Sequence, residues 1–159
     1  MKNNIYITLV IILINLFIFN KGYAVDNEKD KTISNCTQYE DILTDKSKVS
    51  PTSNGYPVSF NTIVFACKKA YEVRPESQNI INFLALANYK NLSFKEAFRF
   101  FKLATDQKNA FGQSALGDMY RKGVGVEKDL KEAFRLYKLA SSQGYAQGQS
   151  NLGWMYVTG

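Results

Sequence analysis

The 159-residue sequence contains no histidine, and it has only three prolines, two cysteines and one tryptophan. The absence of histidine removes the side chain that most often acts as a general base or a metal ligand near neutral pH. No serine is followed three residues later by a lysine, so the nucleophile motif of penicillin-recognising enzymes is missing. Because the acidic residues form no pair with catalytic spacing either, the sequence predicts no enzyme, no cofactor and no metal site.

Long apolar runs are scarce too, and the main one extends from Ile5 to Phe19. Lys2 precedes it, and the small residues Gly22 and Ala24 follow it at the two positions that a signal peptidase inspects. Residues 1–24 are therefore predicted to be a secretory signal peptide, with an uncleaved membrane anchor as the alternative. The run is shorter than the roughly 20 residues that a spanning helix needs. We expect no membrane span after cleavage and a periplasmic or secreted protein.

The charge is moderately positive, with 20 lysines and arginines against 14 acidic residues. The excess lies in residues 59–159, mostly at positions expected to face outward from helices. A solvated surface explains this pattern, and no nucleic-acid partner is predicted.

An internal repeat dominates the second half of the chain. The sequence from Ala110 to Tyr145 starts to repeat at Ala146, so the period is 36 residues. The residues that recur are Ala110, Gln113, Ser114, Leu116, Gly117, Met119, Tyr120 and Gly123. Repeats of this length are typical of solenoids built from stacked helices.

Each unit is predicted to contain two helices. Leu116, Met119 and Tyr120 have helical spacing, and Gly123 provides a left-handed stop for the first helix. Asp129 followed by Glu132 has the spacing of a capping box for the second helix. Small residues at 115 and 117 would let a neighbouring helix come close.

These residues resemble a known family, the Sel1-like repeat (SLR), which is related to the tetratricopeptide repeat but has a longer, glycine-rich loop. The resemblance is carried by Ala115, Leu116, Gly117, Met119, Tyr120, Gly123, Gly125, Val126, Asp129, Ala133, Tyr137, Ala140 and Gly144. It implies an all-α fold, a right-handed α/α solenoid of tetratricopeptide/SLR-type helix pairs with an irregular, disulfide-stapled N-terminal cap. For function it implies a binding scaffold without identifying the ligand.

The remaining chain is divided by its patterns into a leader and further repeat units. Residues 25–58 are predicted to form a leader and irregular cap segment. Within it, a mobile stretch is predicted at Asp26 to Ser34 and one or two helical turns at Tyr39 to Leu43. A loop is predicted at Ser50 to Pro57. The repeat domain at 59–159 comprises a half unit (59–75), a tetratricopeptide-like unit (76–109), an SLR unit (110–145) and a truncated SLR unit (146–159). Ser93 and Glu96 again have capping spacing.

Two cysteines in an exported chain indicate one disulfide, between Cys36 and Cys67. Such a bridge would staple the N-terminal segment over the helix that contains Ile63. Exported bacterial SLR proteins have a similar arrangement of cysteines. A metal-binding pair and a reactive thiol are the alternatives.

A binding role needs a surface, and in stacked α/α repeats the first helices line the concave side. The predicted partner-binding residues are Asn82, Leu86, Tyr89, Ser114, Asp118, Arg121, Lys122, Ser150 and Trp154. Tryptophan, tyrosine and arginine often dominate binding energy, although Trp154 could instead pack against a following helix. The predicted function is a scaffold that binds a protein or peptide, with a cell-wall hydrolase or β-lactam-recognising enzyme and an accessory subunit of an envelope complex as alternatives.

The last predicted helix, from Ala146 onward, can pack backwards through Leu152, Met155 and Tyr156 but has no forward neighbour in this sequence. An uncapped solenoid end exposes apolar surface. We therefore expect a longer array, self-association through this end, or a partner that covers it.

Overall fold

The computed structural model describes residues 27–44 and 58–158, and all regular structure in these ranges is helical. The predicted signal peptide and the predicted loop at Ser50 to Pro57 lie outside the described residues. After a helical stretch at residues 27–37, the helices are α2 (Glu40–Thr44), α3 (Phe60–Val73), α4 (Gln78–Lys90), α5 (Phe94–Asp106), α6 (Ala110–Lys122), α7 (Leu130–Ser142) and α8 (Ala146–Thr158). The expected all-α class is confirmed. None of the described helices combines the length and apolarity needed to cross a membrane.

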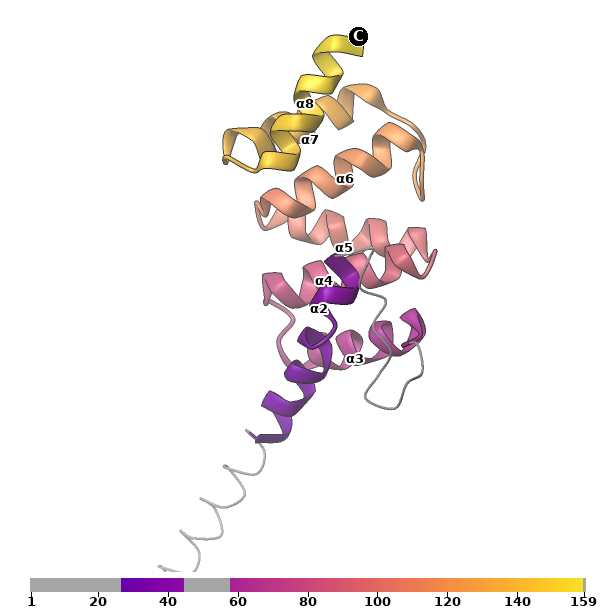
Figure 1. The fold of residues 1–159 in the computed structure, drawn as a ribbon, viewed down its shortest axis with the longest axis vertical. Helices are drawn as coiled ribbons and strands as arrows, with labels where there is room; N and C mark the ends of the chain where they lie inside the picture. Colours follow the sequence, from indigo (N-terminus) through magenta and orange to yellow (C-terminus); the bar gives the residue numbers. More distant parts are fainter. Residues whose placement is uncertain (1–26, 45–57, 159) are drawn as a thin grey trace, which may run out of the picture.

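The helices from α3 to α8 stack one after another along the long axis of the molecule (Figure 1). Each packs against the next in the chain, while α6 also touches α8 and α2 touches α4. Helices α4 and α5 form one pair, and α6 and α7 form the next. These contacts place the first helices of successive units side by side, and we call α2, α4, α6 and α8 the first-helix layer.

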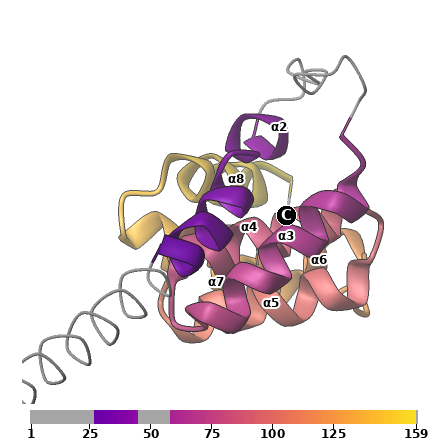
Figure 2. The same cartoon turned by 90° about the horizontal axis from the view of Figure 1, so that it is seen from below.

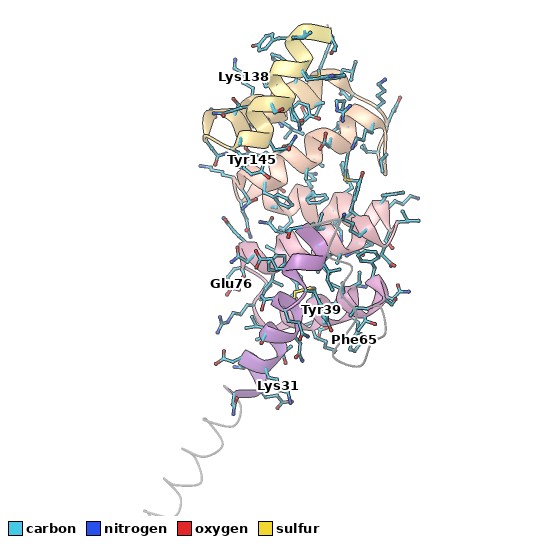
Figure 3. All side chains as sticks on the ribbon, viewed as in Figure 1. Lys31, Tyr39, Phe65, Glu76, Lys138 and Tyr145 are labelled. Atoms are coloured by element: carbon cyan, nitrogen blue, oxygen red, sulfur yellow. A yellow bond between two sulfur atoms is a disulfide. The ribbon has the colours of Figure 1, made fainter. Side chains whose placement is uncertain are left out.

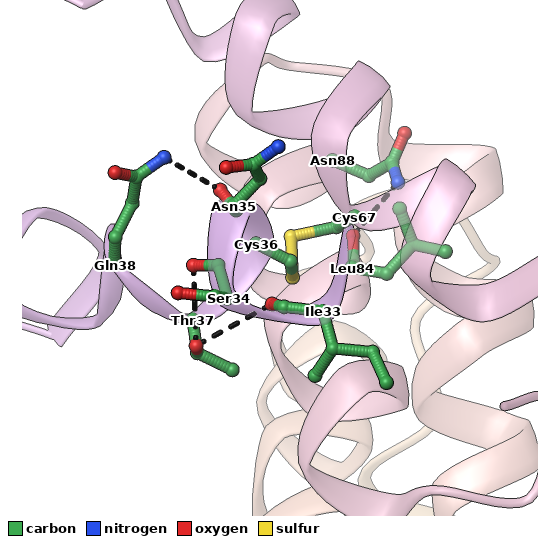
Figure 4. The surroundings of a disulfide bond; sticks show 9 residues. All are labelled: Ile33, Ser34, Asn35, Cys36, Thr37, Gln38, Cys67, Leu84 and Asn88. Carbon is green, nitrogen blue, oxygen red and sulfur yellow. Dashed lines mark hydrogen bonds between the residues drawn. A yellow bond between two sulfur atoms is a disulfide. The ribbon is translucent and has the colours of Figure 1, made fainter. Parts of the chain in front are cut away.

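Residues 27–44 lie across one side of this stack (Figure 2) and are tied to α3 by a disulfide between Cys36 and Cys67 (Figure 4). Both cysteines are fully buried, so the predicted staple is confirmed. The prediction of a mobile stretch at Asp26 to Ser34 was wrong for the part that the structure describes, because residues 27–37 are helical. That prediction used local composition alone, whereas Ile33 packs on the core beside the disulfide and tertiary packing stabilises the helix.

Local sequence signals set several of the helix boundaries. The Asn109 side chain accepts a hydrogen bond from the backbone N–H of Gly112, and Asp129 accepts one from Glu132 N at 3.0 Å. Gly123 ends α6 with a φ of 68°, in the left-handed region. The capping expected at Ser93 is not formed, since its side chain makes no cap hydrogen bond to α5.

Small residues allow the helices to approach closely, and the same contact recurs after 36 residues. A Cβ atom at Gly112 would lie 2.5 Å from Cβ of Ala104, and one at Gly148 would lie 2.6 Å from Cβ of Ala140. The second helix of one unit is therefore packed directly against the first helix of the next. This repeated contact fixes the spacing of the first-helix layer, on which the predicted binding residues lie.

Candidate functional site

Two cavities lie side by side along α4 and α6. The first has a volume of about 280 Å³ and is lined by Thr37, Glu40, Thr44, Asn79, Asn82, Phe83, Leu86 and Phe111. The second has a volume of about 190 Å³ and is lined by Leu86, Tyr89, Phe101, Phe111, Ala115, Asp118 and Lys122. Both include Leu86 and Phe111, so the two cavities adjoin at these side chains, and we call them together the α4–α6 groove.

The groove brings together more than half of the residues predicted to bind a partner: Asn82, Leu86, Tyr89, Asp118 and Lys122. These residues lie on α4 and α6. The buried faces of these two helices pack against the second helices, so their other faces are free to line the groove. The wall that residues 27–44 contribute was not expected. Thr37, Glu40 and Thr44 enter the site because their segment packs beside α4 and is tied to α3 by the disulfide.

The sequence also missed Phe83 and Phe111 as groove residues. Both are large aromatic side chains in first helices, at positions that the repeat pattern assigns to neither face. Phe111 packs edge to face against Phe101 and Tyr145, with ring centroids 5.9 and 6.4 Å apart. The signal that could have identified Phe83 and Phe111 was a large aromatic residue at the edge of the apolar stripe of each helix.

Ser114 was expected to face outward, but it is only 3% exposed, so this placement was wrong. Its hydroxyl lies 3.5 Å from Nδ2 of Asn151, on the neighbouring first helix α8. The contact between α6 and α8 covers it, and the periodicity of a single helix does not reveal which neighbour lies against each side. Ser150, in contrast, is exposed on α8 as expected.

Asp118 and Arg121 share one polar cluster with a tyrosine of the second helix. The Tyr137 hydroxyl donates a hydrogen bond to Oδ1 of Asp118 at 2.8 Å, and Nε of Arg121 donates one to the Tyr137 oxygen at 3.1 Å. Nη2 of Arg121 also lies 3.2 Å from Oδ1 of Asp118. These two residues, which were predicted to bind a partner, therefore also support the core, because Tyr137 is fully buried.

The cluster changes the acidity of its members. Burial raises the pKa of the Tyr137 hydroxyl well above its usual range, and the hydrogen bond to Asp118 raises it further. Burial acts to lower the pKa of Arg121, but its hydrogen bonds to Tyr137 and Asp118 outweigh that effect and raise it. Tyr137 is consequently a neutral hydrogen-bond donor, and its environment favours structural support over proton transfer.

Trp154 contacts the Arg121 guanidinium and lies outside the α4–α6 groove. The Arg121 guanidinium is 5.1 Å from the centre of the Trp154 ring, which is a cation–π contact. These two residues line a separate cavity of about 200 Å³ with Lys128, Leu130, Met155 and Thr158. The predicted site is thus divided between the groove and the surface of α8.

The basic side chains of the second helices lie away from both places. Lys138 projects outward from α7 (Figure 3). Arg99 and Arg135 form exposed ion pairs with Glu96 and Glu132, one turn earlier, at 3.1 and 2.7 Å. Exposed pairs of this kind contribute little to stability. The outward faces of the second helices are therefore a solvated surface.

Comparison with known proteins agrees with this geometry. The Sel1 repeat family model matches residues 90–109, 110–145 and 146–159. Two of these boundaries, at residues 110 and 146, coincide with the first residues of α6 and α8. A search of curated proteins finds no match to this sequence. The 36-residue period, the stacked helix pairs and the family match together show that residues 90–159 consist of Sel1 repeats.

Proposed function

We propose that this protein is an interaction scaffold that holds a segment of a partner protein in the α4–α6 groove. Sel1 repeats support a role in protein–protein interaction. The observation that carries the proposal is that two cavities adjoin at Leu86 and Phe111, because a row of neighbouring cavities fits successive side chains of a peptide segment better than a small ligand.

The lining of the groove favours a segment with a large apolar side chain. Leu86 and Phe111 provide an apolar centre, where such a side chain would be removed from water. Polar groups lie at both ends, with Asn79 and Glu40 at one end and Lys122 at the other. An apolar centre with a few polar groups around it is typical of sites that bind by one anchor and orient by hydrogen bonds.

We further propose that binding takes place outside the cytoplasm, in the periplasm or the surrounding medium. The pattern at residues 1–24 supports export. The disulfide between Cys36 and Cys67 supports an oxidising compartment, where such bonds persist. The disulfide also bears on binding, because it positions the Thr37 and Glu40 wall of the groove.

A peptide-display selection against the oxidised protein tests the groove. We expect the enriched peptides to share a large apolar residue and to lose at least about tenfold in affinity for a Leu86→Lys variant, since a lysine there removes the apolar centre. Leu139→Lys is the matched control, because Leu139 is a partly exposed leucine of α7 (38% exposed) and does not line the groove.

Circular dichroism and thermal melting must show that both variants are folded. Equal binding by wild type and Leu86→Lys would place the binding surface outside the groove. Loss of binding in both variants would likewise reject a groove-specific site.

A further inference from the structure

The two ends of the α4–α6 groove carry opposite charges. At one end, Glu40 lines the first cavity, and the other polar side chains of that lining are uncharged. At the other end, Lys122 lines the second cavity. The apolar centre at Leu86 and Phe111 therefore lies between a carboxylate and an ammonium group.

A second lysine lies at the same end of the groove as Lys122. Lys122 is the last residue of α6, and Lys90 is the last residue of α4. Lys122 comes four residues after Asp118, and Lys90 comes four residues after Leu86, and both of these earlier residues line the second cavity. Because residues four apart lie on the same face of a helix, both lysines lie on the groove side of their helices.

The positive charge at this end is not cancelled by its neighbours. Asp118 is the acidic residue in the lining of the second cavity. Its Oδ1 atom already accepts the hydrogen bond of the Tyr137 hydroxyl and lies 3.2 Å from Nη2 of Arg121. Neither Lys90 nor Lys122 forms an ion pair with a side chain that the structure describes. Their ammonium groups are therefore available to a ligand.

The helix dipole alone does not account for these two lysines. Its negative end favours a cation at the end of any helix. Of the helices α2 to α8, however, only α4 and α6 have basic residues in the last turn. These are the two helices that line the groove, so the positive helix ends occur where a bound segment would meet them.

We propose that the segment bound in the α4–α6 groove is acidic on one side of its apolar anchor, with carboxylate side chains directed at Lys90 and Lys122 and none at the Glu40 end. This inference rests on the proposed function and adds the charge of the partner and the direction in which its chain lies. A carboxylate at the lysine end meets two opposite charges, whereas one at the other end meets a like charge. Such complementarity mainly selects among partners and fixes their register.

The peptide-display selection tests this proposal when it is repeated with charge-reversed protein. For the wild type, we expect aspartate or glutamate to be enriched on one side of the apolar anchor. For Lys90→Glu/Lys122→Glu, we expect the same anchor with lysine or arginine at those positions, because only the sign of the charge has changed. Lys131→Glu/Lys138→Glu is the matched control, since it changes the net charge equally at exposed positions of α7 outside the groove. This control should keep the acidic enrichment.

One peptide enriched on the wild type then measures the size of the effect. Replacement of its acidic residues by glutamine should weaken binding to the wild type by about three- to tenfold at low salt, since individual exposed ion pairs are weak. The loss should shrink at high salt, which screens these charges. The same peptides should bind Lys90→Gln/Lys122→Gln with nearly equal affinity. This variant introduces no negative charge at the helix ends, so it decides the question even if the glutamate variant unfolds.

The outcomes distinguish failure of this inference from failure of the proposed function. An apolar anchor without acidic enrichment, or the same acidic enrichment on folded Lys90→Glu/Lys122→Glu, would overturn the acidic partner and leave the groove as the binding site. Loss of the acidic preference in Lys131→Glu/Lys138→Glu would overturn it too, because overall charge would then select the peptides. Peptides without a common apolar anchor, or equal binding to Leu86→Lys, would reject the groove and this inference together.

Discussion

The ring of Tyr137 lies directly on Gly117, with only 2.7 Å between Cε1 and the position that a Cβ atom of residue 117 would take. Gly117→Ala should therefore destabilise the fold by about 1–3 kcal/mol through overpacking, although alanine favours a helix. Gly153→Ala is the matched control, since its Cβ meets nothing within 4 Å. It should stabilise the protein by up to about 1 kcal/mol. Urea unfolding of both variants measures the contrast, and equal effects would contradict it.

The hydrogen bond from Tyr137 to Asp118 predicts a second effect on stability. Asp118→Ala should lower the free energy of unfolding by about 1–3 kcal/mol, because it removes the acceptor of a buried hydroxyl. Adding Tyr137→Phe to Asp118→Ala should recover part of this loss, since no hydroxyl then remains to be satisfied. Asp106→Ala, at an exposed position of α5, is the control. Failure of the double variant to recover stability would show that Asp118 acts in another way.

The raised pKa of Tyr137 predicts a loss of stability in alkali. Burial, followed by the bond to Asp118, keeps Tyr137 protonated in the folded state, while the unfolded chain releases this proton near the usual value of about 10. Above that pH the folded state binds more protons, so the free energy of unfolding should fall by up to about 1.4 kcal/mol per pH unit for this tyrosine. Below it, this contribution is fully present.

Urea unfolding on both sides of the ordinary tyrosine pKa measures the slope, with Tyr137→Phe as the comparison. Tyr120 and Tyr145 also have raised pKa values through burial, so the variant should keep a shallower slope. Identical slopes would show that Tyr137 ionises alike in both states.

The repeat was predictable because its signals are local or periodic. Gly123 and Asp129 act within one turn of their helices, and the 36-residue period identifies equivalent positions without any knowledge of their contacts. The disulfide was predicted from the count of two cysteines in a chain that was expected to be exported. Packing of apolar faces at helical spacing then determined the order of the stack.

The errors have a common physical cause, which is that helical spacing does not identify the neighbour on each side. Ser114 faces outward from its own pair but is covered by α8. Asp118 lines the groove as expected, but the hydroxyl of Tyr137 also reaches it from the second helix, which its spacing did not reveal. Residues 27–37 are helical through contacts with α3 that lie more than 30 residues away in sequence. Each case depends on a long-range contact that periodicity alone cannot reveal.

The left-handed end of α6 predicts a strict requirement at Gly123, whose φ is 68°. Gly123→Val should destabilise the protein by more than about 1 kcal/mol, because a β-branched residue is strained in this region. Gly123→Asn should cost less, since asparagine tolerates the left-handed conformation. Thermal melting of the wild type and the two variants ranks their stabilities. A valine variant that melts like the wild type would show that the helix end can rearrange.

The disulfide makes the last prediction, because Cys36 and Cys67 connect residues 27–44 to α3 across 31 positions of sequence. Protein purified from an oxidising compartment should show no free thiol when unfolded. The double variant Cys36→Ala/Cys67→Ala should lose about 3–4 kcal/mol of stability on the chain-entropy model, which corresponds to roughly 6–16 °C in Tm. Hydrogen exchange should accelerate in α3 more than in α7, which the bridge does not touch. Two titratable thiols, or a uniform change in exchange, would contradict a staple confined to this end of the solenoid.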